Sequence, residues 1–436
     1  MGSPCFRAFV RYSSLNMLGM LALSCYVLAD TFFVANALGA DGLAALNLAL
    51  PVYAFFHGCG LMVGMGGATR YTILREQGRG EQANAVFTHA LAMVCVLAVF
   101  FTSLGLFGAD FLTRILGADA VTWPMTRVYI QVLLLFSPAY LLNDLLIAFV
   151  RNDGAPHLSM LGMTAGSLSN IVLDYVFIYI MDWGMFGAVF ATGLAPIISL
   201  SVLSPFFFKK RNRFHPVRCT PAPHLCGSIC ATGVPALVAE VSAGFVMIVF
   251  NVILLDLGGN LAVAAYGVVA NLSMVVFAIF SGLAQGVQPL LSRYYGGGDL
   301  PSIRATLRYA VGTVLLLSAL LYAFLFLGAD PIAMAFNEAR DPALQAIAVR
   351  GLKLYFTGLT FTGLNLLLTN YFPAVGHPRP SHLISVLRGF LLILPLVFLL
   401  ARLWGMDGLW LANPLTELLV AGLALFLYLR QRSSLL

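Results

Sequence analysis

Apolar residues fill most of this chain, in stretches far longer than the core of a soluble protein requires. Asp, Glu, Lys and Arg are absent from residues 86–108, 184–208, 257–292 and 354–378. A helix needs roughly 20 such residues to cross about 30 Å of hydrocarbon. The apolar positions are continuous rather than alternating, which excludes a transmembrane β-barrel. Because backbone groups in lipid must hydrogen-bond within their own segment, these stretches are predicted to be membrane-spanning helices.

Glycine, proline and charged residues divide the chain into twelve apolar segments, which predicts an all-α membrane protein with twelve transmembrane helices. A polar, proline-bearing stretch, residues 209–224, separates six segments from the other six. We expect it to be a cytoplasmic linker between an N-terminal lobe, residues 1–208, and a C-terminal lobe, residues 225–436. The predicted segments lie near residues 10–36, 43–72, 86–108, 124–150, 157–181, 185–208, 226–255, 262–292, 305–328, 345–371, 381–403 and 407–430.

The second half of the sequence repeats the first at offsets of 219, 222 and 221 residues. Such a duplicated bundle of apolar helices is typical of a secondary transporter with two lobes around a shared cleft. The repeated segments are Leu38-Gly39-Ala40-Asp41 with Leu257-Gly258-Gly259-Asn260, Gly154-Ala155-Pro156 with Gly376-His377-Pro378, and Trp183-Gly184-Met185 with Trp404-Gly405-Met406.

The composition, with 60% hydrophobic and 10% charged residues and a mean hydropathy of +0.91, excludes a soluble domain. The net charge of +6 reflects topology rather than nucleic-acid binding. Of the 24 basic residues, 18 fall on the side of both termini, Arg151 and Arg388 among them, and 6 on the other. Basic loops stay in the cytoplasm, so we expect a multi-pass cell-membrane protein with both termini cytoplasmic.

The sequence predicts neither a disulfide framework nor a cleaved signal peptide. The seven cysteines are scattered, mostly inside predicted helices, so no disulfide framework is expected. The first apolar segment is too long for a cleaved signal peptide and is expected to serve as its own insertion signal. We expect no cofactor beyond a coupling ion, no nucleic-acid partner, contact with membrane lipid, and a monomer.

Five acidic residues interrupt the apolar segments, and ionisable groups at such depth cost several kcal/mol, so each is a functional candidate. Asp30 and Asp174 both lie about 28 Å from the cytoplasmic end of their helices at a rise of 1.5 Å per residue. Asn170 precedes Asp174 by one turn, and Thr192 reaches a similar layer from the next helix. The other three acids are Asp144, Glu240 and Glu417.

The four side chains of Asp30, Asn170, Asp174 and Thr192 form an all-oxygen set that suits a hard cation such as Na⁺. The same set suits a proton, because two close carboxylates in a low dielectric do not both stay ionised comfortably. Our hypothesis is therefore a cation or proton coupling site, and the alternative is that both aspartates only hold helices together by local hydrogen bonds.

A second group of polar residues consists of secondary candidates for substrate contact. Asp144 either lines an inner gate or touches a cationic substrate, or it pairs with Arg151 two turns later. Glu417, which follows Pro414, is either a substrate ligand or a structural carboxylate. The histidines lie mostly near predicted loops. The full set of substrate candidates is Asn143, Asp144, Glu240, Gln288 and Glu417.

With these residues in view, the chain resembles the MATE family of multidrug and toxic compound extrusion transporters, most of all its bacterial multidrug-exporting branch. The resemblance covers nearly the whole chain. The motifs that carry it are Phe149-Val150-Arg151-Asn152-Asp153-Gly154-Ala155-Pro156, Asn170-Ile171-Val172-Leu173-Asp174, Ala264-Ala265-Tyr266-Gly267-Val268-Val269-Ala270-Asn271, Gly286-Val287-Gln288-Pro289-Leu290 and Gly376-His377-Pro378-Arg379-Pro380.

The resemblance implies two pseudo-symmetric six-helix bundles with a central V-shaped cleft, and export of organic cations in exchange for Na⁺ or H⁺. It also implies a first-lobe cation site, onto whose positions Asp30, Asn170, Asp174 and Thr192 fall. Some members have a first helix bent at a proline, but this chain has none between Arg11 and Asn36.

The intramembrane residues favour an exporter over two other functions. A lipid-linked oligosaccharide or lipid flippase of the same superfamily would favour basic residues in the cleft, whereas the intramembrane charges here are mainly acidic. An intramembrane enzyme would need a nucleophile or metal arrangement such as H-E-x-x-H, which the sequence lacks.

Overall fold

The computed structural model describes residues 4–337 and 340–434, with the side chains of 432–434 left aside. These ranges are almost entirely helical and contain no strand. The first half comprises α1 (Pro4–Glu76), α2 (Gly80–Phe107), α3 (Ala109–Ile115), α4 (Trp123–Leu135), α5 (Ser137–Asn152), α6 (Pro156–Asp174), the π-helix η1 (Tyr175–Ile180) and α7 (Gly184–Phe208). The second half comprises α8 (Pro223–Gly296), α9 (Leu300–Leu327), α10 (Ala329–Ala335), α11 (Pro342–Tyr355), the 3-10 turn η2 (Phe356–Gly358), α12 (Leu359–Ala374), α13 (Pro378–Val386), the π-helix η3 (Leu387–Leu391) and α14 (Ile393–Ser434).

Twelve membrane crossings account for these helices. Seven helical stretches of the described chain are long and apolar enough to span a membrane, and the bent pair α4–α5 makes an eighth. Three of the stretches are broken by a non-helical glycine, at Gly39 in α1, Gly259 in α8 and Gly405 in α14, so each contains two crossings. The run from α11 to α12 supplies the last one. The expected all-α fold with twelve spans is therefore confirmed.

The backbone torsions of glycines show the duplication of the two halves more clearly than the sequence does. Four glycines of the first half with a left-handed φ have counterparts in the second, and the pairs are Gly39 with Gly259, Gly78 with Gly298, Gly154 with Gly376, and Gly184 with Gly405. Gly39 and Gly259 have nearly identical torsions, φ 67°, ψ −158° and φ 63°, ψ −159°. The sequence alignment paired Gly39 with Gly258, which is wrong by one residue. It matched the Leu-Gly pair common to both segments, whereas the glycine at the bend of the second segment is Gly259.

The fourth predicted segment, near residues 124–150, is not one straight helix. It bends by 50° between α4 and α5, beside Pro138. Proline has no backbone N–H and its ring clashes with the preceding turn, which accounts for the bend. The first span of α1, by contrast, has no non-helical residue before Gly39, as expected of a segment without proline.

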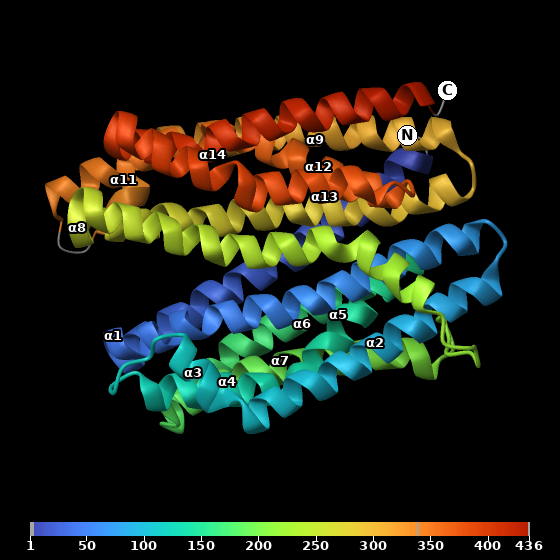
Figure 1. Cartoon of the computed structure of the whole chain (residues 1–436), viewed down its shortest axis with the longest axis horizontal. Coiled ribbons are helices and arrows are strands. Elements are labelled where there is room, and N and C mark those ends of the chain that lie inside the picture. The colour runs from blue at the N-terminus through green and yellow to red at the C-terminus, as the bar shows by residue number, and fades with distance from the viewer. Residues whose placement is uncertain (1–3, 338–339, 435–436) are drawn as a thin grey trace.

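The apolar side chains form two separate cores, one for each half of the chain. Each core also takes in the start of the long helix from the other half. Phe9 and Tyr12 of α1 belong to the second-half core, and Ile229 of α8 belongs to the first. In Figure 1 the blue start of α1 accordingly crosses to the yellow and red helices near both termini. The lobe boundaries at residues 208 and 225 stay a prediction.

Close backbone contacts join the halves towards the end that carries both termini, called here the terminal end. A Cβ added to Gly66 would lie 2.2 Å from the Ile229 carbonyl oxygen, and one on Gly233 would lie 1.8 Å from that of Met62. Only glycine permits such an approach. In Figure 1 the ribbons of α1 and α8 lie farther apart near their labels than towards the terminal end. The closest backbone contacts between the halves are thus at the terminal end.

Candidate functional site

Two buried aspartates lie together inside the first half. Asp30, on the first span of α1, is 7% exposed, and Asp174, the last residue of α6, is 0% exposed. The carboxylates of Asp174 and Asp30 lie close enough to interact electrostatically. One oxygen of each, Oδ1, is buried without a hydrogen-bond partner among the described residues. Buried polar atoms are normally paired, so these two oxygens are open to a ligand.

Asn170 and Thr192 complete this group, called here the first-half oxygen site. In the orientation of the Asn170 amide that satisfies both its ends, Nδ2 donates to Asp174 Oδ2 at 3.0 Å and the amide oxygen accepts from the Thr192 N–H at 3.1 Å. The Thr192 hydroxyl donates to the Ala188 carbonyl at 2.9 Å, and the Tyr129 side chain lies within hydrogen-bonding reach of the same residue. The structure therefore brings together the four side chains that the sequence proposed as one site.

The helix that carries Asp174 changes geometry at this point. The π-helix η1 begins with Tyr175, directly after Asp174. A π-turn widens the helix and weakens its regular hydrogen bonding, and such turns are frequent at functional sites. The second half has the related π-helix η3 in the corresponding span. Neither π-turn was expected from the sequence, because their residues continue the apolar pattern of an ordinary helix.

A second polar group lies between α1, α5 and α8. His57 Nδ1 lies 3.0 Å from Asp144 Oδ2, and both side chains are buried. Glu240 of α8 acts on His57 as a nearby charge. Its Cβ would lie 3.3 Å from a Cβ on Gly58, so α8 packs closely here. Glu240 and Asp144, from the two halves, thus flank one histidine, and we call this the His57 group.

The structure corrects one sequence expectation at the His57 group and adds a residue to it. Asp144 does not pair with Arg151, which instead donates to Asn16 Oδ1 at 2.6 Å and to Gln285 Oε1 at 3.3 Å. The added residue is His57, one of the few histidines away from loops, which lies inside the second span of α1. His57 could have been found from the sequence, because it is a lone ionisable residue in an apolar segment. The same criterion selected the five acidic residues. Asn143, next to Asp144 in sequence, has a buried Oδ1 with no hydrogen-bond partner in the described part of the chain.

Tyrosines connect the first-half oxygen site with the His57 group. The hydroxyls of Tyr26 and Tyr53 lie 3.4 Å apart, and the Tyr53 ring stacks on His57 with centroids 5.2 Å apart. Tyr140 donates to the Thr192 carbonyl at 2.8 Å. Tyr26 stands one helical turn before Asp30. Tyrosine side chains therefore occupy the space between the aspartates and the histidine, which the apolar pattern of the sequence did not indicate.

Gln288 lies in a hydrogen-bond network that connects the second half of the chain to the first. Its amide donates to Thr69 Oγ1 at 2.6 Å and to Ser292 Oγ at 3.0 Å, and its oxygen accepts from Asn152 Nδ2 at 3.3 Å. The residue is only 2% exposed. The geometry makes Gln288 a link across the terminal end, and the substrate contact proposed for it stays a prediction.

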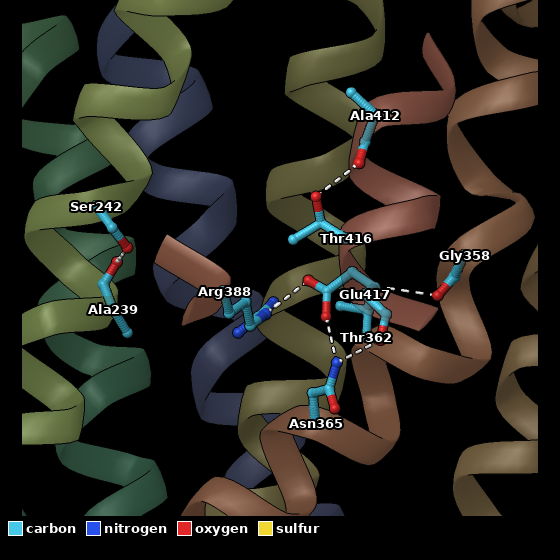
Figure 2. A network of polar contacts seen from close by, with 9 residues as sticks. All are labelled: Ala239, Ser242, Gly358, Thr362, Asn365, Arg388, Ala412, Thr416 and Glu417. Carbon is cyan, nitrogen blue, oxygen red and sulfur yellow. Dashed lines mark hydrogen bonds and ion pairs between the residues drawn. The ribbon is translucent and has the colours of Figure 1, made fainter. Parts of the chain in front are cut away.

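Glu417 is held by two partners inside the second half, as Figure 2 shows. Arg388 Nε donates to Glu417 Oε1 at 2.6 Å, and Asn365 Nδ2 donates to Oε2 at 2.7 Å. Arg388 was counted among the cytoplasmic loop residues, which is wrong, because it belongs to the π-helix η3 in mid-span. Arg151 is likewise buried, at 2% exposure. The two arginines are therefore structural charges rather than topology signals.

The described residues contain no group of three or more His, Cys, Asp and Glu side chains suited to a metal ion, and all seven cysteines are free. The arrangement is that of a membrane protein with buried ionisable groups inside two duplicated helical bundles, which is typical of a transporter.

Comparison with known proteins identifies the family. The MatE family profile matches residues 16–176 and 235–399, most of the chain. The protein therefore belongs to the MatE family of transporters and is not an enzyme, and the resemblance drawn from its motifs is confirmed.

Individual relatives agree with this assignment. The chain is 27% identical to the multidrug export protein MepA of Staphylococcus saprophyticus, over 93% of this chain and 89% of that protein. It is equally similar, with the same coverage, to MepA of a Staphylococcus aureus strain.

Solved structures match the fold over its whole length. One is the outward-facing conformation of a multidrug resistance MATE family transporter of the MOP superfamily, with a TM-score of 0.92 at 24% identity. Another is a MOP superfamily transporter from Pyrococcus furiosus, with a TM-score of 0.91 at 24% identity. A third is MATE in complex with MaL6, with a TM-score of 0.92 at 25% identity. Each match covers 100% of this chain and 97% of the other.

Proposed function

We propose that the protein is a multidrug efflux antiporter that exports amphiphilic organic cations in exchange for Na⁺ or H⁺ across the cell membrane, with both termini in the cytoplasm. The observation that carries the proposal is the pair of buried, unpartnered carboxylate oxygens of Asp30 and Asp174. Two such groups, ionised together in a low dielectric, repel one another, and binding one cation or proton relieves that repulsion. Loading therefore stabilises one arrangement of the bundle over the other.

The ligands of the ion follow from the same group. Asp30, Asp174 and the hydroxyl of Thr192 offer oxygen atoms that suit Na⁺, and the Asn170 amide holds Asp174 in place. A proton needs only one of the two carboxylates. The energy comes from the gradient, since each charge moved through 100 mV supplies about 2.3 kcal/mol.

The substrate is assigned to the His57 group between the halves. Glu240 and Asp144 supply negative charge from opposite sides, and the Tyr53 ring lies beside them. A desolvated carboxylate attracts an organic cation, and an aromatic face adds a cation–π contact of about 0.5 to 2 kcal/mol. The name of the MepA relatives, multidrug export proteins, supports a broad range of such substrates.

A lipid or oligosaccharide flippase is the second candidate, and the charges disfavour it. A pyrophosphate headgroup needs uncompensated basic residues at mid-membrane. The intramembrane arginine of the second half, Arg388, is instead paired with Glu417.

Purified protein in liposomes tests the proposal. Tetraphenylphosphonium, a lipophilic cation, is loaded inside or outside while a Na⁺ gradient or a pH gradient is imposed separately. We expect at least one gradient to drive the cation against its own concentration. Passive equilibration under both gradients would count against antiport, and movement of a fluorescent phospholipid instead would favour the flippase.

A further inference from the structure

Arg388 is an intramembrane cation whose role the coupling and substrate sites do not use. It lies about 15 Å from the start of α13, at 1.5 Å per residue, and so near mid-span. An arginine at this depth is costly and usually marks a pathway or a partner. Its pair with Glu417 explains the charge balance but not the choice of arginine over lysine.

The geometry fixes the guanidinium in one place. A Cβ added to Gly389 would lie 2.6 Å from Ser242 Cβ, so η3 is pressed against α8. The guanidinium carbon lies 5.5 Å from the centroid of the Phe277 ring. Figure 2 shows Arg388 and Asn365 approaching Glu417 from different directions.

Most of the donors on Arg388 are unused. Only Nε donates to Glu417, and among the described residues neither terminal nitrogen has a hydrogen-bond acceptor. The side chain is 17% exposed, so these nitrogens are not sealed in packed apolar side chains. A guanidinium carries five N–H donors, and its fork matches a carboxylate in two parallel hydrogen bonds.

A second polar atom without a hydrogen-bond partner among the described residues lies in the same cluster. Asn365 uses its Nδ2 for Glu417, but its Oδ1 is buried without a partner among the described residues. Tyr355 lies within electrostatic reach of both Glu417 and Arg388, and Phe277 supplies an aromatic face. Donors, an acceptor and aromatic rings therefore gather around a charge pair that is itself neutral.

From this we infer a carboxylate subsite in the second half, formed by the terminal nitrogens of Arg388 beside Phe277 and Tyr355. It rests on the proposed function, and it assigns a place in the second half to the carboxylate of a zwitterionic aromatic amphiphile. Their amine is drawn to the acidic His57 group, and their carboxylate is received by Arg388. Glu417 holds the fork in position and keeps the empty subsite from acting as a bare positive charge.

A matched pair of dyes tests this subsite. Rhodamine B carries a carboxylate beside its cationic ring system, and its ethyl ester has the same ring system without that charge. Binding of both to purified protein is measured by fluorescence polarisation, and their transport is measured in liposomes. The variants are R388K, which keeps the ion pair but loses the fork, and R388Q/E417Q, which removes both charges and leaves no buried unpaired carboxylate.

Because hydrogen bonds to charged groups contribute about 1.5 to 3 kcal/mol, we expect both variants to weaken rhodamine B binding at least tenfold. The ester should change less than threefold. Equal losses for both dyes, or none, would overturn the subsite and leave the proposed function standing if the ester is still transported. Arg388-dependent binding of rhodamine B without gradient-driven transport of either dye would support the subsite and overturn the proposed function.

Discussion

Asp144 Oδ2 and His57 Nδ1 lie 3.0 Å apart across α5 and α1, and Glu240 of α8 completes the group from the other half. This pair places a titratable cation where the proposed substrate's positive charge is expected. Under the proposed function, a protonated His57 and an organic cation compete for the same two carboxylates.

Neutralising Glu240 should weaken substrate binding without unfolding the protein. Glu240→Gln removes one of the two negative charges at the His57 group, and we expect KM for tetraphenylphosphonium to rise about tenfold, as for the loss of a partly desolvated charge contact. The matched control is Glu81→Gln, an exposed acid in the first turn of α2. Unchanged KM in both variants would remove Glu240 from the substrate site.

A methyl group at the contact between the halves should destabilise the protein. Because a Cβ on Gly233 would lie 1.8 Å from the Met62 carbonyl oxygen, Gly233→Ala forces the backbones apart at a cost of about 1 to 3 kcal/mol. The expected result is a lower Tm in detergent. Gly244→Ala in the same helix is the control, since nothing lies within 4 Å of its Cβ. It should keep or raise the Tm, and equal behaviour of the two variants would contradict the contact.

The bends at Gly39 and Gly259 should be equally sensitive to side chains. Both torsions lie in a region that glycine alone occupies readily, so alanine at either costs about 1 to 3 kcal/mol through backbone strain. No steric clash contributes, because nothing lies within 4 Å of either Cβ. Differential scanning fluorimetry of G39A and G259A checks this. A helical glycine, Gly267→Ala, serves as control, and matching Tm values for all three would refute the strain.

The buried and exposed ion pairs of the second half should respond very differently. Glu417→Gln leaves Arg388 uncompensated inside the bundle, which costs about 3 to 5 kcal/mol. Asp407→Asn breaks the pair with Arg350, whose side chain is 66% exposed, and costs about 1 kcal/mol or less. Thermal unfolding compares the two, and similar losses would show that the Glu417 pair is hydrated rather than buried.

The sequence predicted the spans and the first-half oxygen site because both follow from local rules. Apolar run length defines the crossings, and helical rise puts Asp30, Asn170, Asp174 and Thr192 in one layer. The structure places these four side chains near one another, because depth in the membrane can be counted from the ends of a helix, and their role as a coupling site stays a prediction.

The predictions that were wrong concern contacts between segments that are distant in the sequence. The partner of Asp144 is His57, 87 positions away, rather than Arg151 on the same helix. Arg388 looked like a loop residue because charge suggested a helix end, whereas Glu417 from α14 allows it to lie in mid-span. The π-turns and the exchange of helix starts between the two cores leave no mark in an apolar pattern. Such features follow from tertiary contacts alone.

The central claim is that the Asp30 and Asp174 pair links the ion to the movement of the bundles. The most direct measurement compares gradient-driven accumulation with substrate exchange at equilibrium in liposomes, using the wild type, Asp30→Asn, Asp174→Asn and the exposed control Asp182→Asn. We predict that both site variants lose accumulation while retaining exchange of tetraphenylphosphonium, and that the control behaves as the wild type. Full ion-driven accumulation by Asp174→Asn would contradict the account.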